Sequence, residues 1–370
     1  MPAPSPAIVL APHAYTTADA KTAHGLVRGT ERFEIVAVVD PDCAGRDAGE
    51  LLDGRHRAIP VVGDLEQGVA IAAGRVRHCI VGVATHGGRL TPLLRRALAD
   101  AARRGLAIVN GLHDPAAEDP DIAAAAAASG VEIIDLRRVR PTRELHHWEG
   151  HVREVRAVRV AVLGTDCALG KRTTARMLVQ ALRGAGISAE MIYTGQTGWM
   201  QGARYGFVLD ATPNDYVCGE LEHALVACDR EVAPDVMVIE GQSSLRNPSG
   251  PCGSELILAG GARAVVLQHA PGRRFLDGFE ALGLPLPDVA DEIALVRHLG
   301  AETLAVTLNG EGLTPEALER HRAALEARIG IPVVSVLEQG LDRVVGPIRA
   351  HLGRTPGESP APGPRASDED

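Results

Sequence analysis

One segment of the chain has the residue types and the spacing of a loop that binds phosphate. It reads GTDCALGKRTT, follows an apolar stretch and opens a helical pattern. Glycines let backbone N–H groups point at an anion, the lysine adds a positive charge, and a helix start adds a partial positive charge. A glycine-rich turn without a ligand is the alternative. We predict that this loop binds a cofactor through Gly164, Thr165, Asp166, Cys167, Ala168, Leu169, Gly170, Lys171, Arg172, Thr173 and Thr174.

The segment departs from the strict phosphate-loop pattern in two ways. Five residues instead of four separate Gly164 from Gly170, and Arg172 stands where the pattern has serine or threonine. The hydroxyl at that position normally holds Mg²⁺, and Thr173 comes one residue late, about 100° further round a helix. An arginine can instead donate two hydrogen bonds to a phosphate. The departure favours a phosphorylated ligand over hydrolysis of a Mg-nucleotide.

Polar side chains also follow two other apolar stretches. VMVIEGQSSL places Glu240 at a strand end, and YTGQTGWMQG begins at another. Ligands of open α/β sheets bind at the carboxyl edge of the strands. Glu240 is therefore a candidate proton acceptor or, together with Thr173, a Mg²⁺ ligand if a Mg-nucleotide is used; a surface acid is the alternative. The substrate-binding candidates in these loops are Gln196, Thr197, Gln242 and Ser243.

Two further segments carry groups that could do chemistry. LDATPNDYVCGELE supplies Asp215, which could bind a cation or act as a base, although an acid at a helix start explains it equally well. QHAPGRRFLDG supplies His269 and the adjacent Arg273 and Arg274, which suit a carboxylate or a phosphate. An exposed loop is the alternative for these three. Asn309, at the end of VTLN, could read the edge of a purine.

Apolar stretches that alternate with helical patterns must position these residues. This alternation predicts an α/β chain with two parallel sheets. The first is an N-terminal Rossmann-like domain over 1–140, with strands at Ile8–Ala11, Ile35–Asp40, His78–Ala84, Ala107–Leu112 and Val131–Arg137. The second is a C-terminal P-loop NTPase-like domain over 157–352, with a helix at Thr173–Gly184 and strands at Val158–Thr165, Ala189–Gly195, Asp235–Gly241, Ala264–Ala270, Thr303–Gly310 and Ile331–Glu338.

The remaining segments are expected to be polar and irregular. Residues 141–156 read as a connector, whose His146, His147 and His151 we interpret as solvated and not as metal ligands, because no second shell is evident. The loop after the first strand lacks GxGxxG, which argues against an ordinary dinucleotide site. Residues 353–370 are rich in Pro, Ser and acid and predict a disordered tail.

The composition excludes several classes of protein. A length of 370 residues with 45% hydrophobic side chains suits two folded domains and excludes wholesale disorder. Only 3% aromatic residues and a net charge of −9 argue against a dedicated nucleic-acid binder. We expect no signal peptide and no membrane span. Six scattered cysteines are typical of reduced thiols, so we expect a cytoplasmic protein.

These motifs together resemble a known family. GTDCALGK resembles the loop of dethiobiotin synthetase-like P-loop proteins, and IEG resembles their strand-end acid motif. The fuller set of GTDCALGKRTT, YTGQTGWM, NDYVCGELE, IEGQSSL and HAPGRR, behind a Rossmann-like domain, resembles a bacterial P-loop family formerly of unknown function. That family includes D-glutamate N-acetyltransferases, and the similarity covers nearly the whole chain except the tail.

The resemblance implies the transfer of an acetyl group from acetyl-CoA to the amine of an acidic D-amino acid such as D-glutamate. CoA phosphates would sit on the predicted loop, Arg273 or Arg274 would meet a substrate carboxylate, and the candidate bases are Glu240, Asp215 and His269, in that order. An ATP-dependent kinase or ligase acting on a small carboxylate, with Mg²⁺, is the second hypothesis, and a regulatory nucleotide-binding protein is the third. We expect a homo-oligomer.

Overall fold

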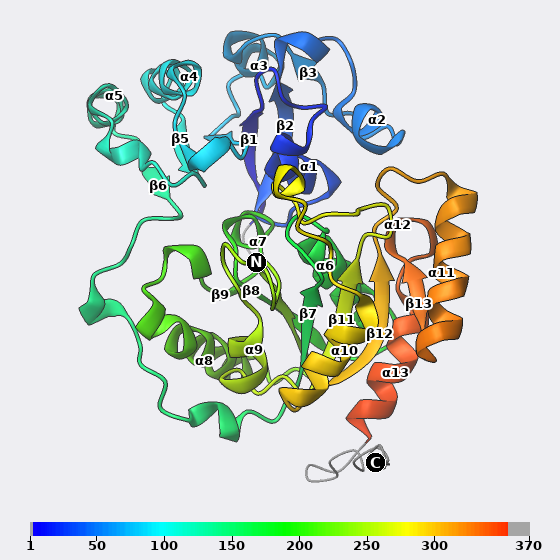
Figure 1. The fold of residues 1–370 in the computed structure, drawn as a ribbon. Coiled ribbons are helices and arrows are strands. Elements are labelled where there is room, and N and C mark those ends of the chain that lie inside the picture. Colours follow the sequence, from blue (N-terminus) through cyan, green and yellow to red (C-terminus); the bar gives the residue numbers. More distant parts are fainter. Residues whose placement is uncertain (1–2, 354–370) are drawn as a thin grey trace, which may run out of the picture.

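The computed structural model describes residues 3–353, which form two parallel β-sheets with helices on their faces (Figure 1). The first sheet has the strand order β3-β2-β1-β4-β5-β6, which is the order of a Rossmann fold. Its strands are β1 (Ser5–Leu10), β2 (Phe33–Val39), β3 (Val61–Val62), β4 (His78–Val81), β5 (Ala107–Asn110) and β6 (Ile133–Asp135). Its helices are α1 (Lys21–Arg28), α2 (Ala48–Asp53), α3 (Leu65–Ile71), α4 (Pro92–Arg103) and α5 (Pro120–Ser129).

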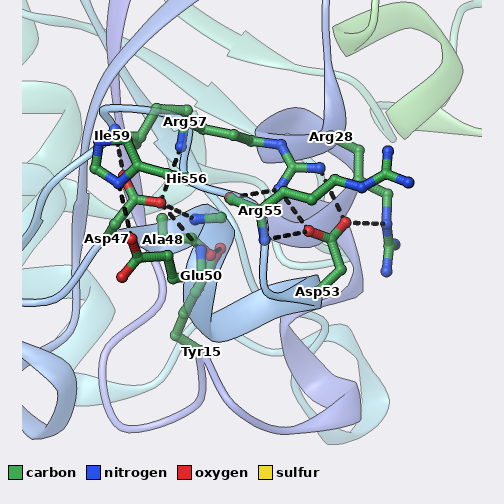
Figure 2. Close-up of polar contacts among 11 residues, drawn as sticks. Tyr15, Arg28, Asp47, Ala48, Glu50, Asp53, Arg55, His56, Arg57 and Ile59 are labelled. Atoms are coloured by element: carbon green, nitrogen blue, oxygen red, sulfur yellow. Dashed lines mark hydrogen bonds and ion pairs between the residues drawn. The ribbon is translucent and has the colours of Figure 1, made fainter.

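Polar contacts around Asp47 join the start of α2 to the loop that follows this helix (Figure 2). Its carboxylate accepts hydrogen bonds from the backbone N–H groups of Gly49, Glu50, Arg57 and Ile59, at 2.9 to 3.1 Å. Burial acts to raise the pKa of Asp47, but the N–H donors outweigh it and the pKa is lowered. These contacts cap the helix start, so the cluster has a structural role.

The second sheet has the strand order β13-β12-β11-β7-β10-β8-β9. Its strands are β7 (Val158–Gly164), β8 (Ala189–Tyr193), β9 (Tyr205–Gly206), β10 (Val236–Glu240), β11 (Ala264–His269), β12 (Glu302–Leu308) and β13 (Val333–Ser335). Its helices are α6 (Lys171–Gly184), α7 (Gln196–Met200), α8 (Asn214–Glu231), α9 (Ser254–Leu258), α10 (Val289–His298), α11 (Pro315–Ile329), α12 (Val336–Gln339) and α13 (Asp342–Leu352).

The central strands of this sheet are apolar throughout because both of their faces are covered. Along β7, Ala161 and Leu163 join the core on one face, whereas Val160 and Val162 join the core on the other. Successive side chains of a strand point to opposite faces, so a strand that is buried on both sides needs a continuous apolar run. The two predicted α/β sheets are thereby confirmed.

The two domains meet through α7, which lies between them in Figure 1. Met200, at the end of α7, is fully buried in the core of the first domain. The Gln201 side chain donates to the carbonyl of Gly25 at 2.7 Å, and Arg32 donates to the carbonyl of Trp199 at 2.7 Å. The first domain therefore packs directly against a loop that the sequence predicts to be part of the site.

Several details differ from the sequence prediction, and most predicted strands are shorter in the structure, such as β6 (Ile133–Asp135) within the predicted Val131–Arg137. The strand predicted over Ile331–Glu338 covers only Val333–Ser335, because the chain turns into α12 at Val336. The two-residue strands β3 and β9 were not predicted. His146 stays partly exposed, but it also makes specific contacts: its Nδ1 lies 2.8 Å from the buried carboxylate of Glu220, and its ring stacks on His223.

Residues 354–370, which hold nearly all of the predicted tail, lie outside the described part of the chain. The segment between the two sheets contains two short 3-10 turns, Thr142–Glu144 and His151–Glu154. Within the described residues, no helix combines the length and the apolar character that a membrane crossing requires.

Candidate functional site

The predicted phosphate loop joins the end of β7 to the start of α6. Thr165 and Asp166 are fully buried, and two later residues, Ala168 (φ 51°) and Gly170 (φ 96°), have left-handed backbone conformations. Such conformations turn successive N–H groups toward one side of a loop, which creates a concave anion site. Glycine adopts this conformation without strain, whereas alanine does not. The strain at Ala168 is a mark of a functional loop.

Lys171 is the cationic group of this loop. It is buried at the first position of α6, and its Nζ donates a hydrogen bond of 2.6 Å across the loop to the carbonyl of Asp166. Burial lowers the pKa of Lys171 to about 8, although the nearby Cys167 and Asp166 act in the opposite direction. The ammonium is therefore held beside the loop, where an anionic ligand would restore its usual pKa.

Arg273 and Asn309 brace the loop from the ends of neighbouring strands. Arg273 Nη1 donates to the Asp166 carboxylate at 3.2 Å and to the carbonyl of Cys167 at 2.9 Å. Asn309 donates to the carbonyl of Leu169 at 3.2 Å. The contacts that the structure gives these two side chains are with the loop itself. Their roles toward a substrate carboxylate and a purine remain predictions.

Glu240 lies at the end of β10, next to β7 in the sheet. Its carboxylate is buried and accepts the backbone N–H of Thr194 at 3.1 Å. Burial raises the pKa of Glu240, and the charges of Arg172 and Lys171 offset this in part. A buried carboxylate with a raised pKa, beside a lysine on a phosphate loop, is suited to accept a proton from a bound substrate.

The loop after Glu240 closes one side of the site. Gln242 donates to the Thr194 hydroxyl at 3.0 Å, and Ser243 Oγ lies 3.4 Å from the Cys167 sulfur. Ser243 has a left-handed conformation (φ 40°), which costs a non-glycine residue energy and is common at ligand sites. The structure thus brings Ser243 to the phosphate loop, whereas Gln242 lies against Thr194 at the end of β8.

The hydroxyl groups after Lys171 have different surroundings. The Thr174 hydroxyl is buried and donates to the Gln268 side chain at 2.5 Å. Thr173 is half-buried at the third position of α6. The role of Thr173 and Glu240 as Mg²⁺ ligands remains a prediction.

Arg172 leaves the loop and packs on the first domain. Its Nη2 donates to the carbonyl of Lys21 at 3.3 Å, and a Cβ added at Gly25 would lie only 2.6 Å from that nitrogen. Its Nε is buried, and no hydrogen-bond partner for it is found in the described part of the chain. Helix α1 of the Rossmann-like domain therefore holds Arg172 close enough to Glu240 for their charges to interact. A direct contact of Arg172 with phosphate remains a prediction.

The other predicted residues are spread more widely. The Thr197 hydroxyl lies 3.3 Å from that of Thr22, and Gln196 lies against Gly111, so both face the first domain. Asp215 is exposed in the first turn of α8. His269 Nδ1 lies 3.0 Å from the Thr165 hydroxyl, and burial lowers the pKa of His269 to about 4.

Two residues of the site were not predicted. The Gln268 side chain accepts hydrogen bonds from Thr174 and Thr307, and it anchors the start of α6 to the sheet. Thr194 contacts both Glu240 and Gln242. The signal for Gln268 was present, because a polar residue inside the apolar run AVVLQHA must find a partner when it is buried.

Among residues 3–353, the side chains that lie close enough together to share a metal ion are His13, Asp40 and Asp42, in the first domain. The buried Asp40 carboxylate already accepts the N–H groups of His13 and Tyr15, at 3.1 and 2.8 Å. These bonds fold the loop that lacks GxGxxG, so the acid at the end of β2 has a structural role.

Comparisons with known proteins agree with this architecture. Residues 146–345 match the family model described as a domain of unknown function, DUF1611, P-loop domain, and residues 41–139 match the model of its Rossmann-like N-terminal domain. A crystal structure of a DUF1611 family protein from Anabaena variabilis superposes with a TM-score of 0.85 and 28% identity, over 94% of this chain and 99% of that chain.

Curated relatives carry functional names. A D-glutamate N-acetyltransferase of Tritonibacter scottomollicae is 30% identical over 76% of this chain and 83% of the relative. Another, from a Pseudoalteromonas species, is 25% identical over 72% of this chain and 79% of the relative. An ATP-dependent dethiobiotin synthetase of Haloferax mediterranei is 32% identical over 43% of this chain and 66% of the relative.

Proposed function

This chain belongs to the DUF1611 family, a Rossmann-like domain followed by a P-loop domain, and from that premise we propose that it is an N-acetyltransferase. In this proposal it transfers the acetyl group of acetyl-CoA to the amine of an acidic D-amino acid such as D-glutamate. The two N-acetyltransferase relatives, which align with about three quarters of the chain, support the reaction class.

The observation that carries the proposal is the buried Glu240 carboxylate next to Lys171 on the phosphate loop. In the proposed reaction Lys171 and the loop N–H groups bind CoA phosphates, and Glu240 accepts a proton from the substrate amine. The nitrogen then attacks the thioester carbonyl. The N–C bond forms and the C–S bond breaks. The amine starts as an ammonium group, so the nitrogen gives up two protons: the first goes through Glu240 to solvent, and the departing sulfur takes the second.

The position after Lys171 supports CoA over a Mg-nucleotide. Arg172 occupies it and turns toward α1, and the hydroxyl of Thr174 is engaged by Gln268. Binding of CoA would not require a metal, whereas P-loop kinases need a Mg²⁺ ligand at this place. The similarity to a dethiobiotin synthetase favours the second candidate, an ATP-dependent kinase or ligase in which Thr173 and Glu240 hold the Mg²⁺.

An assay with two donors separates these candidates. The purified protein is incubated with a panel of D- and L-amino acids and either acetyl-CoA or Mg-ATP, while free thiol and ADP or AMP are measured. We expect thiol release with acetyl-CoA and an acidic D-amino acid, with the N-acetyl product detected by mass spectrometry. Formation of ADP or AMP that depends on a substrate, without thiol release, would overturn the proposal.

The contact between α1 and Arg172 gives a more specific prediction. Gly25→Ala should displace the Arg172 guanidinium, because the new Cβ would lie 2.6 Å from its Nη2. Arg172 favours the ionised form of Glu240, so its loss should raise the pKa of Glu240 further. We expect kcat/KM at neutral pH to fall by roughly tenfold, with the acid limb of the pH profile moved to higher pH.

A matched glycine provides the control. Gly184 ends α6, the same helix as Arg172, and a Cβ there would meet nothing within 4 Å. Gly184→Ala should leave both kcat/KM and its pH profile unchanged. An unaltered pH profile in Gly25→Ala would show that helix α1 does not influence the base.

A further inference from the structure

A cavity of about 440 Å³ lies beside the phosphate loop, between the end of β11 and helices α10 and α11. Its walls are partly aliphatic, with Leu286, Val289 and Leu325 among them, and partly basic, with Arg274 and Arg328. Its volume is in the range of small-molecule sites. The proposed roles of Lys171 and Glu240 leave this cavity without a function.

The cavity has a surplus of positive charge. Arg328 is paired with Asp288 at 2.9 Å, whereas no ion pair is found for Arg274 among residues 3–353, and its guanidinium lies over the ring of Phe275. The His321 imidazole, which also lines the cavity, offers a further hydrogen-bond donor. An anionic group would therefore be attracted to the Arg274 side of the cavity, where no carboxylate of residues 3–353 pairs with the guanidinium.

We infer that this cavity receives the 3′-phosphoadenosine end of CoA, with the 3′-phosphate bound by Arg274 and His321. The inference rests on the proposed use of acetyl-CoA. A purine has two apolar faces that aliphatic walls can cover, and a phosphate monoester needs donors of this kind. A small dicarboxylate would use the basic groups but would leave the aliphatic walls without a partner, so the nucleotide end fits both halves of the lining.

The cavity is joined to the phosphate loop by two side chains. His269 lines the cavity, and its Nδ1 lies 3.0 Å from the hydroxyl of Thr165 in the loop. Arg273 also lines the cavity and holds the loop through Asp166. A ligand whose pyrophosphate lies on the loop can therefore place its nucleotide end on the other side of these two residues.

The 3′-phosphate can be tested on its own, because dephospho-CoA lacks only that group. Isothermal titration should show that the wild-type protein binds CoA at least about tenfold more tightly than dephospho-CoA. Arg274→Ala, and more strongly the double variant Arg274→Ala/His321→Ala, should weaken CoA binding about tenfold and leave dephospho-CoA binding within about twofold. Arg320→Ala is the matched control, because Arg320 is exposed on the same helix as His321 and does not line the cavity.

The outcomes distinguish this inference from the proposed function. Tight CoA binding with no preference over dephospho-CoA, or equal losses for both ligands in Arg274→Ala, would overturn the cavity assignment and leave the acetyltransferase proposal standing. Failure of the wild-type protein to bind either ligand would overturn both. Since Arg274 and His321 are exposed, their loss should not disturb folding, which the melting temperature checks.

Discussion

Replacement of Lys171 by alanine should weaken CoA binding at least about 100-fold and abolish acetyl transfer. The ammonium is the cationic group of the phosphate loop that the structure buries, and charge-assisted hydrogen bonds to phosphate contribute up to about 3 kcal/mol each. Titration calorimetry measures the loss directly and does not depend on the assay. Unchanged affinity would exclude the loop as the ligand site.

The second lysine of the chain provides a matched control for this substitution. Lys171 and Lys21 are the two lysines of the sequence, and Lys21 is exposed at the start of α1. Lys21→Ala removes the same charge, and its side chain is not part of the loop, so CoA affinity should change by less than about twofold. A large loss in Lys21→Ala would mean that the overall charge, and not the loop, governs binding.

The same lysine predicts how binding depends on pH. Its pKa in the free protein is lowered to about 8, so the ammonium is present below that pH and is lost as the pH rises through it. CoA affinity should therefore decline above about pH 8. In Lys171→Arg the guanidinium stays charged, and any remaining affinity should not decline in this range.

Much of the fold was predictable because burial on both faces leaves a clear pattern. The strands β7, β10 and β11 are continuous apolar runs between glycine-containing loops, and their predicted positions agree with the structure to within a residue or two. The pattern fails where it is short. The two-residue strand β3 is too short to show a hydrophobic period. The short segment Val336–Glu338 is compatible with a strand and with a helix.

The residues of the candidate site that lie on or next to predicted strands could be identified from the sequence. The loop, Lys171 and Glu240 lie on or next to strands that the sequence locates, and parallel strands bring their carboxyl ends together. The direction of Arg172 was not predictable, because it depends on the Lys21 carbonyl, 151 positions away along the chain. The same holds for Arg273, whose acceptor Asp166 is 107 positions away. Such contacts are set by how the elements pack, and no local pattern encodes them.

Glu240→Gln should reduce kcat by roughly 10²- to 10⁴-fold, the usual contribution of a general base, and leave CoA affinity within about threefold. Glutamine keeps an oxygen that can accept the Thr194 N–H, so the local fold should survive, but it cannot take a proton. Asp215→Asn, at an exposed helix start, is the comparison and should change kcat by less than about threefold.

The pH profile decides whether Glu240 is the base. Burial raises the pKa of its carboxyl above the ordinary value, and a base must be ionised to act, so kcat/KM of the wild type should rise with pH through that raised pKa. The residual rate of Glu240→Gln should lack this acid limb. If the limb persists with its midpoint unchanged, another group accepts the proton. His269 would not explain an acid limb well above pH 5, because the pKa of His269 is lowered to about 4.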